Sequence, residues 1–591
     1  MAASTERRSK RRRQGGRDAP ARAQRRTRAR AVVCTGRRGL ELRPHPDDGS
    51  FRAPLREGQF TAGDIVAVRF ERRGRVRAER RLGRVGDPEL DFAGLCDLHA
   101  LPRAFPPACL RELESGGLQR DESEADRLDL TSLPFVTIDP QRARDHDDAV
   151  FAERRGGGFG LWVAIADVSA FVPAGSALDR EARKRGNSVY LPDRVVPMLP
   201  EALSGDLCSL RPREERLALA VELAIDARGE RQRLRVVAAR IRSRAKLAYE
   251  EAAKGMDGAA GHDPEIAESL RSLAALAAIL RERRVAEGSL DLELAEAEPV
   301  VDARGRVSAI GRAARTVAHR AIEEAMLAAN RAIAELLVDA RWPTLHRIHE
   351  PPDPGELAEL EPVLASLGLW PGRMRRAPGA ADLAGLVEAS RERSDARVVH
   401  GLLVRAMRQA RYADEPLGHF ALGFERYLHF TSPIRRYADL VVHRAVKAQL
   451  ARQRPARAPL ADLAEHLSRR ERAAAQAEYQ ALDWKRAALL LPRVGQRFEG
   501  RVSTIAPAGL FVTLDAVAGD GLLPARTLPR RAHLDLRRAV VTIGRERIRL
   551  GDRISVRLAG VDPARGRFSL ALAGYSDAEG STRPARRSHS G

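Results

Sequence analysis

The most informative stretch of the chain runs from Thr137 to Ala149, Thr-Ile-Asp-Pro-Gln-Arg-Ala-Arg-Asp-His-Asp-Asp-Ala. It continues an apolar, strand-like segment and contains four carboxylates, those of Asp139, Asp145, Asp147 and Asp148. Carboxylates so close together repel one another unless cations lie between them. Hard oxygen ligands of this kind suit magnesium and phosphate chemistry. A solvated acidic loop is the alternative, and the charge cluster alone does not exclude it.

The charge balance indicates a polyanionic partner. The 591 residues, too many for a single core, include 102 Lys and Arg against 80 Asp and Glu, a net charge of +22. A surplus of this size favours nucleic acid or an anionic membrane surface. No apolar stretch reaches the roughly 18 residues that cross a bilayer, and no basic amphipathic helix is apparent. Almost all the basic residues are Arg, which indicates phosphate recognition or a GC-rich genome.

The cysteines and the N-terminus predict a cytoplasmic protein. The four cysteines (Cys34, Cys96, Cys109, Cys208) have no C-x-x-C spacing and no paired histidines beside them. This pattern favours reduced thiols over a disulfide or zinc framework. The first thirty residues lack the apolar centre of a signal peptide.

The pattern along the chain predicts a multidomain α+β protein. Residues 1–30 contain twelve Arg or Lys and two acids, a net charge of +10, and predict a disordered basic arm. Residues 31–90 alternate short apolar runs with turns, which is typical of a small antiparallel barrel, and 91–125 form a polar connector.

The middle of the chain, residues 126–490, mixes strand patterns such as 135–139 with helical ones such as 317–337 and 438–450. Residues 494–574 again alternate between turns and predict a five-stranded OB-type barrel. A loose tail rich in Ser and Arg is expected over 575–591.

The aspartate stretch resembles the signature of the RNB family of 3′-to-5′ exoribonucleases, the family of ribonucleases R and II. The segments that follow the family in order are VAIADVSAFVPAGSALDREA, NSVYLPDRVVPMLPEALSGDLCSLRP, HRAIEEAMLAAN, LHRIHE and HFTSPIRRYADLVVHR. The resemblance implies a central catalytic domain with a mixed sheet and helices, flanked by OB-fold barrels.

The resemblance also implies roles at the aspartate cluster. The four aspartates would hold magnesium, two ions per site, together with the attacking water. Asp147 and Asp148 would act in the chemistry. Arg435 would point at the scissile phosphate, where a fixed guanidinium stabilises developing charge. Arg436 is the alternative to Arg435, and an ordinary helix-surface role is the alternative for both.

Further positions match RNA-contacting residues of the family. Tyr190 matches a tyrosine that stacks on bases near the 3′ end, and Tyr249 one that lines the catalytic cavity. Glu323 or Glu324 matches an acidic residue that orients the terminal nucleotide. A core position is the alternative for each tyrosine.

Four positions depart from the family pattern. Ala170 and Leu292 stand where relatives often have His and Phe, so a weaker grip on the last nucleotides is expected. Ala508 replaces an aromatic in the second barrel. His146, inside the aspartate loop, is interpreted as a spacer and not as a metal ligand.

The flanking barrels resemble RNA-binding modules. The C-terminal one is similar to an S1-type domain, in which exposed aromatics stack on bases above a basic groove. Phe498 and Phe511 are its candidates, with one of the two expected in the core. The N-terminal barrel resembles a cold-shock domain without its usual aromatic run.

The resulting hypothesis is a monomeric, cytoplasmic exoribonuclease that binds single-stranded RNA and releases nucleoside 5′-monophosphates. The ribosome or other RNA-decay factors are further candidate partners. Two other classes remain open: a non-catalytic RNA-binding protein on the same fold, and an interaction protein whose arm docks on ribosomes.

Overall fold

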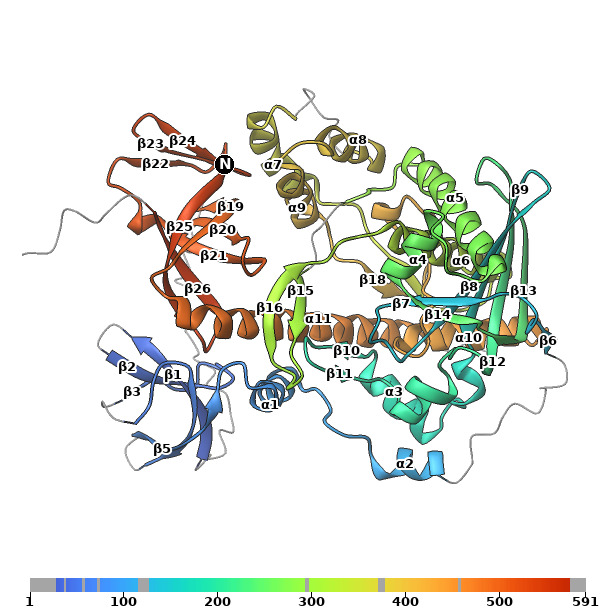
Figure 1. The fold of residues 1–591 in the computed structure, drawn as a ribbon, viewed down its shortest axis with the longest axis horizontal. Helices are drawn as coiled ribbons and strands as arrows, with labels where there is room; N and C mark the ends of the chain where they lie inside the picture. Colours follow the sequence, from blue (N-terminus) through green and yellow to red (C-terminus); the bar gives the residue numbers. More distant parts are fainter. Residues whose placement is uncertain are drawn as a thin grey trace, which may run out of the picture. The chain divides into compact units, whose positions relative to one another are not determined.

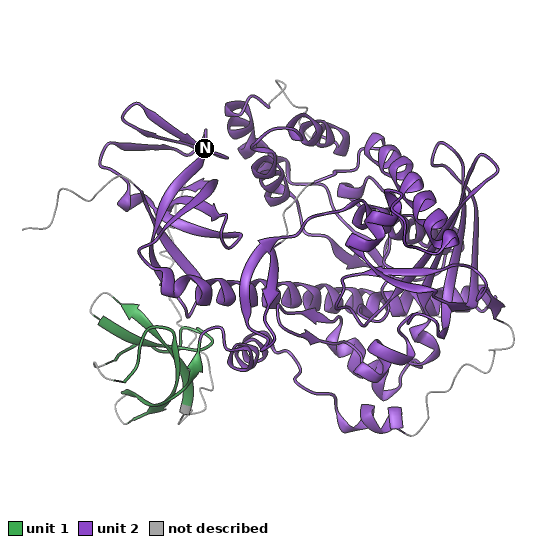
Figure 2. Cartoon of the chain, in the orientation of Figure 1, with its two compact units in different colours: residues 1–84 green, residues 85–591 purple. Residues whose placement is uncertain are grey.

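The computed structural model describes residues 28–36, 39–55, 59–71, 75–114, 127–292, 297–369, 378–454 and 459–573. The chain divides into two compact units, residues 1–84 and 85–591 (Figure 2). Most of the expected basic arm and all of the expected tail lie outside the described residues. The first strand begins at Arg28, three residues inside the range predicted for the arm.

The first unit contains a five-stranded antiparallel sheet of order β3-β2-β1-β4-β5. Its strands are β1 (Arg28–Gly36), β2 (Gly39–Pro44), β3 (Ala53–Pro54), β4 (Asp64–Phe70) and β5 (Val76–Arg84). Alternate apolar residues such as Val33, Leu42 and Val66 form its buried face. Among the described residues no ladder joins β3 to β5, so the expected barrel is seen as an open sheet.

The second unit is built around a seven-stranded mixed sheet of order β14-β7-β8-β9-β12-β13-β6 (Figure 1). Its strands are β6 (Leu128–Asp129), β7 (Val136–Asp139), β8 (Asp148–Arg155), β9 (Gly158–Ala166), β12 (Glu215–Ile225), β13 (Arg231–Arg242) and β14 (Ala245–Ala248). The central strand β9 is buried along its whole length, because both faces of the sheet are covered.

Helices pack on both faces of this sheet. One face lies against α4 (Tyr249–Met256), α5 (Pro264–Ala286) and α6 (Val317–Asp339). The other lies against α2 (Pro107–Glu114) and α3 (Ala177–Arg185), and α10 (Tyr437–Leu450) contributes residues to both cores. The helices predicted at 317–337 and 438–450 are confirmed as α6 and α10, since their apolar residues recur with helical spacing and become buried.

The long helix α11 (Ala461–Leu490) links the remaining parts of this unit. Its buried Trp484 lies in a small core shared with α1 (Pro88–His99) and the hairpin of β10 (Val189–Tyr190) and β11 (Val195–Val196). Three further helices, α7 (Pro354–Ser366), α8 (Ala380–Ser390) and α9 (Ala396–Ala406), enclose a core of their own. Two further two-stranded antiparallel sheets belong to this unit. The hairpin of β15 (Ala297–Val301) and β16 (Val307–Arg312) is one, and the other pairs β17 (His346–Ile348) with β18 (Arg411–Ala413) across the segment that contains α7, α8 and α9.

The C-terminal part forms a closed five-stranded barrel, as predicted. Its strands are β19 (Arg497–Ala506), β20 (Gly509–Leu514), β21 (Gly519–Pro524), β25 (Arg553–Asp562) and β26 (Arg567–Leu572). A separate three-stranded sheet is inserted between β21 and β25, made of β22 (Ala532–Asp535), β23 (Val540–Ile543) and β24 (Glu546–Arg549). The sequence interpretation did not separate this sheet from the barrel.

All four cysteines lie within the described residues, each is buried, and no disulfide joins any two of them. In the part of the chain that the structure describes, no helix has the length and apolar character needed to cross a bilayer.

Candidate active site

The loop between β7 and β8 brings the four aspartates to one end of the central sheet. Asp139 is the last residue of β7 and Asp148 the first of β8, and the two strands pair with each other. Ser209 fixes the loop between them. Its hydroxyl donates to the carbonyl oxygen of Arg144 at 2.7 Å and accepts from the backbone N–H of His146 at 3.0 Å.

Asp147 is held from a segment almost three hundred residues further along the chain. Its Oδ1 accepts from the backbone N–H of Ile434 at 2.8 Å, and its Oδ2 lies 3.2 Å from Nε of Arg435. The Asp147 side chain is 3% exposed, whereas that of Arg435 is 43% exposed and also donates to the hydroxyl of Ser432. The guanidinium of Arg435 is therefore held through Nε and Nη2, while the side chain remains partly exposed.

The carboxylates crowd one another electrostatically. Burial raises the pKa of Asp147 well above its usual range, with Arg435 opposing the shift and the charges of Asp145 and Asp148 adding to it. Burial, followed by the charge of Asp139, raises the pKa of Asp148 to about 7. A cation placed among these carboxylates would offset the free-energy cost of burying their charges and would reduce their mutual repulsion.

His146 does more than separate the aspartates, so its interpretation as a mere spacer is corrected. The ring is buried, and its Nδ1 lies 2.6 Å from Oδ2 of Asp139. An imidazole in this position orients the carboxylate. The sequence shows only that residue 146 lies between two aspartates. The contact with Asp139 depends on how the loop folds back, which the sequence does not reveal.

Tyr190 stands in the site and is 38% exposed, which excludes the core position considered for it. Its hydroxyl donates to Oδ2 of Asp145 at 2.7 Å, and its backbone N–H donates to Oε1 of Glu478 at 2.8 Å. Tyr190, Arg435 and Glu478 line a cavity of about 260 Å³. Glu478, on α11, was not singled out from the sequence, because nothing distinguishes it there from the other charged residues of that helix.

Tyr249 opens α4 and stacks on His319 in the first turn of α6, with ring centroids 3.7 Å apart and an interplanar angle of 13°. Burial raises the pKa of the Tyr249 hydroxyl, and the charges of Asp148 and Asp139 raise it further. The tyrosine therefore lies beside the aspartate cluster. His319 was missed, although it opens the HRAIEEAMLAAN segment.

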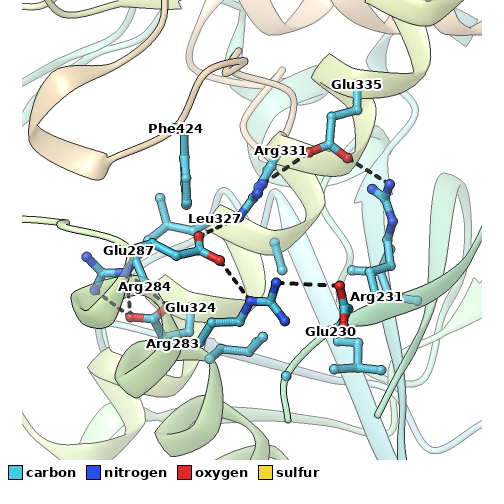
Figure 3. Close-up of a pocket in the computed structure, with 15 residues that line it drawn as sticks. Glu230, Arg231, Arg283, Arg284, Glu287, Glu324, Leu327, Arg331, Glu335 and Phe424 are labelled. Atoms are coloured by element: carbon cyan, nitrogen blue, oxygen red, sulfur yellow. Dashed lines mark hydrogen bonds and ion pairs between the residues drawn. The ribbon is translucent and has the colours of Figure 1, made fainter.

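The two candidate glutamates of α6 differ in availability. Glu324 is buried and pairs with Arg284 at 2.6 Å, and Figure 3 shows this pair at the edge of a second cavity. Glu323 is partly exposed and pairs with Arg315 at 2.6 Å. Of the two alternatives Glu323 is the more accessible, since the Glu324 carboxylate is paired with a buried guanidinium.

Arg436, the alternative to Arg435, is also paired within the protein. Its Nε and Nη2 donate to the two carboxylate oxygens of Asp439 at 2.9 and 2.7 Å. Asp439 is fully buried and also accepts from the backbone N–H of Ser432 at 2.8 Å. The Arg436 fork thus fixes the turn before α10, which leaves Arg435 as the arginine able to meet a phosphate.

In the C-terminal barrel the two phenylalanines separate. Phe498 is 6% exposed in the barrel core, so it is the one of the two that was expected there, and its candidacy as a stacking platform is corrected. Phe511 is half-buried on β20. Of the positions that depart from the family pattern, Ala170 is buried, Leu292 packs beside the α7–α9 core, and Ala508 is exposed at the β19–β20 turn.

The donor set fits a hard divalent cation in chemistry, since four carboxylates crowd together with raised pKa values at two of them. Among the described residues, however, no three His, Cys, Asp or Glu side chains converge as a ready ligand set. Asp139 and Asp145 are turned toward His146 and Tyr190 instead. Metal binding at this site would exchange these contacts for coordination.

Comparison with known proteins defines the class. The RNB domain model matches residues 127–452, and the S1 RNA binding domain model matches residues 491–573. The chain therefore belongs to the RNB family, and its multidomain α+β fold with a small C-terminal barrel is confirmed.

Its relatives include ribonuclease R of Escherichia coli, 38% identical over 492 residues that cover 78% of this chain and 60% of that protein. Ribonuclease R of Aquifex aeolicus is 36% identical over 86% of this chain and 75% of its own length. The chain thus spans about three fifths of the Escherichia coli relative.

A solved structure, Mycoplasma genitalium RNase R in complex with ribose methylated single-stranded RNA, is similar with a TM-score of 0.78 and 26% identity. The similarity covers 93% of this chain and 90% of that one.

Proposed function

We propose that this protein is a magnesium-dependent exoribonuclease that degrades single-stranded RNA from its 3′ end to nucleoside 5′-monophosphates. The observation that carries the proposal is the pairing of Asp147 with Arg435 across 288 residues. This pair brings together a buried carboxylate that could bind a metal ion and a half-exposed guanidinium that could stabilise charge on a phosphodiester. The name of the Mycoplasma genitalium structure, a complex with single-stranded RNA, supports the choice of substrate.

Magnesium would be held by Asp139, Asp145, Asp147 and Asp148, where it activates water and neutralises charge on the phosphate. Arg435 would donate to the phosphoryl oxygens as charge develops on them. Because Asp147 and Ser432 already fix this guanidinium, little reorganisation is needed when the substrate arrives.

Tyr190 would offer its ring to a base near the 3′ end, since its hydroxyl and backbone are already tied to Asp145 and Glu478. Tyr249, supported by the ring of His319, would form another wall beside the carboxylates. Discrimination against DNA would come from contacts with the 2′-hydroxyl.

The test is a gel time course on 5′-labelled single-stranded RNA, with and without EDTA. We expect progressive shortening that stops with EDTA and resumes with added magnesium. Binding to RNA without shortening under any metal condition would assign the chain to the non-catalytic RNA-binding class. Co-sedimentation with ribosomes in the absence of any nuclease activity would assign it to the interaction class.

A further inference from the structure

The sheet inserted into the C-terminal barrel has one apolar and one polar face. Leu534, Val541 and Ile548 lie opposite one another across its three strands and pack on the barrel core. Because side chains alternate along a strand, the residues next to them point the other way. The barrel closes through β19, β20, β21, β26 and β25 without this sheet, so the polar face is not needed for closure.

The polar face lines a cavity of about 640 Å³. Across the strands it presents His533 beside Thr542 and Arg547, and in the next row Val540 beside Arg549. The opposite wall is the C-terminal end of α7, an element of the RNB domain. There Ser366 donates from its hydroxyl to the carbonyl oxygen of Arg538 at 2.9 Å, which ties the two walls together.

The charge of this segment is unbalanced. Residues 529–551 contain seven arginines and two acids, a net charge of +5. The arginines are Arg530, Arg531, Arg537, Arg538, Arg545, Arg547 and Arg549. All seven are exposed, and the ion pairs found among the described residues include none of them. The one acidic residue lining the cavity, Asp535, already accepts from the backbone N–H of Arg538.

We propose that this cavity and the arginines around it bind the phosphate backbone of RNA, as a contact region separate from the active site and from the barrel strands. Guanidinium groups bind phosphates in a bidentate manner and release counterions when they do so. Three arginines line the cavity, and four more lie at the turns and at the edge of the same sheet. This spread exceeds what a single phosphate group can engage, and it favours a polyanion over a mononucleotide.

The proposal takes RNA as the polyanion from the proposed function but does not depend on catalysis. A binding measurement therefore separates the two: loss of turnover with intact binding bears only on the proposed function. The Asp147→Asn variant serves as the common background, because it keeps the RNA uncleaved during titration.

The test compares two triple variants that remove the same charge. R538A/R547A/R549A removes the three arginines that line the cavity. The control, R228A/R233A/R304A, removes three other exposed arginines that no described ion pair includes. Binding to a long single-stranded RNA is measured at several salt concentrations. Each phosphate contact on a single strand contributes about 0.7 to the slope of log K against log salt. We expect the first variant to lose about 2 units of slope and about tenfold in affinity, and the second to stay within about twofold.

Three further arms decide the ligand class. R538K/R547K/R549K retains the charges and is expected to keep most of the slope. A nucleoside monophosphate, or polyglutamate, is expected not to displace RNA at matched phosphate or carboxylate concentration. Equal losses in both triple variants, or displacement by either competitor, would overturn the proposal.

Thermal unfolding checks that the substituted sheet is intact. If the triple alanine variant is unfolded, Thr542→Glu places a carboxylate in the centre of the same face without removing an arginine. It is expected to weaken long-RNA binding in the same direction, and unchanged binding would again overturn the proposal.

Discussion

Two groups of arginines in this chain differ in whether the protein supplies their counter-charge. In the turn before α10, Arg435 faces Asp147 and Arg436 faces Asp439. In the inserted sheet, seven exposed arginines have no such partner among the described residues. A guanidinium fixed by a buried carboxylate is set up for positioning or chemistry, whereas an unpaired one is available to an external anion. The first group should resist salt and the second should respond to it.

The largest effect is expected for Asp147→Asn, which removes the carboxylate that fixes Arg435 and so tests whether this pair serves catalysis. We expect hydrolysis to fall below roughly one thousandth of the wild-type rate, because the residue belongs to a cluster that acts as a unit. RNA binding should be retained or tightened, since a charge that repels phosphate is lost. A labelled-RNA gel measures turnover and a titration measures binding.

The matched control is Asp302→Asn, which changes a carboxylate in the exposed β15–β16 turn. Its cleavage rate should equal that of the wild type. Near wild-type cleavage by a folded Asp147→Asn variant would contradict the catalytic assignment.

Substitution of the two neighbouring arginines should affect different properties, turnover for Arg435 and stability for Arg436. Arg435→Ala is expected to lower the turnover rate by about 10²- to 10³-fold with a small change in affinity, because the group acts on charge that develops in the transition state. Arg436→Ala should instead lower the free energy of unfolding by about 3 kcal/mol, because Asp439 is left buried without its cation. Single-turnover kinetics and denaturant unfolding distinguish the two outcomes. An affinity defect alone in Arg435→Ala would assign that residue to simple phosphate binding.

The repeating patterns of the chain were sufficient to predict much of the fold. Helical spacing predicted α6 and α10, and period-two alternation between turns predicted the C-terminal five-stranded barrel. The inserted sheet was missed although its pattern is present in the sequence. Leu534 and Val541 alternate with His533 and Thr542, but short strands flanked by arginines look like turns when taken one at a time.

The site was predictable only as far as its motifs extend. The aspartates and Arg435 follow from the resemblance. The separate roles of Arg435 and Arg436 depend on which buried carboxylate each guanidinium contacts, Asp147 or Asp439. The contact between Tyr190 and Glu478 joins residues 288 positions apart. No local pattern predicts such a pairing, because it arises from how α11 crosses the domain.

Tyr190 tests how the site holds its substrate, because the hydrogen bond described for its side chain is with an aspartate of the cluster and not with an arginine. Tyr190→Ala should lengthen the final short product more than it slows the initial decay, because loss of stacking costs about 1–3 kcal/mol per base near the 3′ end. Tyr190→Phe keeps the ring and removes only the hydrogen bond to Asp145. We expect its product ladder to resemble the wild type. Identical ladders for Ala, Phe and wild type would show that the ring holds no base.

The smallest effect is expected for the basic N-terminus. Its arginines are a third group, besides the pair before α10 and the seven of the inserted sheet. Residues 1–27 lie outside the described residues and contain ten Arg or Lys and two acids, a net charge of +8. Deleting them leaves β1, which begins at Arg28 and pairs with β4, intact. If three of these cations meet RNA phosphates, the slope of log K against log salt becomes shallower by roughly 2 units, while turnover is unchanged. Combined with R538A/R547A/R549A, the two losses should add, because independent sites without shared partners contribute additively. A slope equal to that of the full-length protein would show that the arm does not engage RNA, and its charge would then be assigned to another partner such as the ribosome.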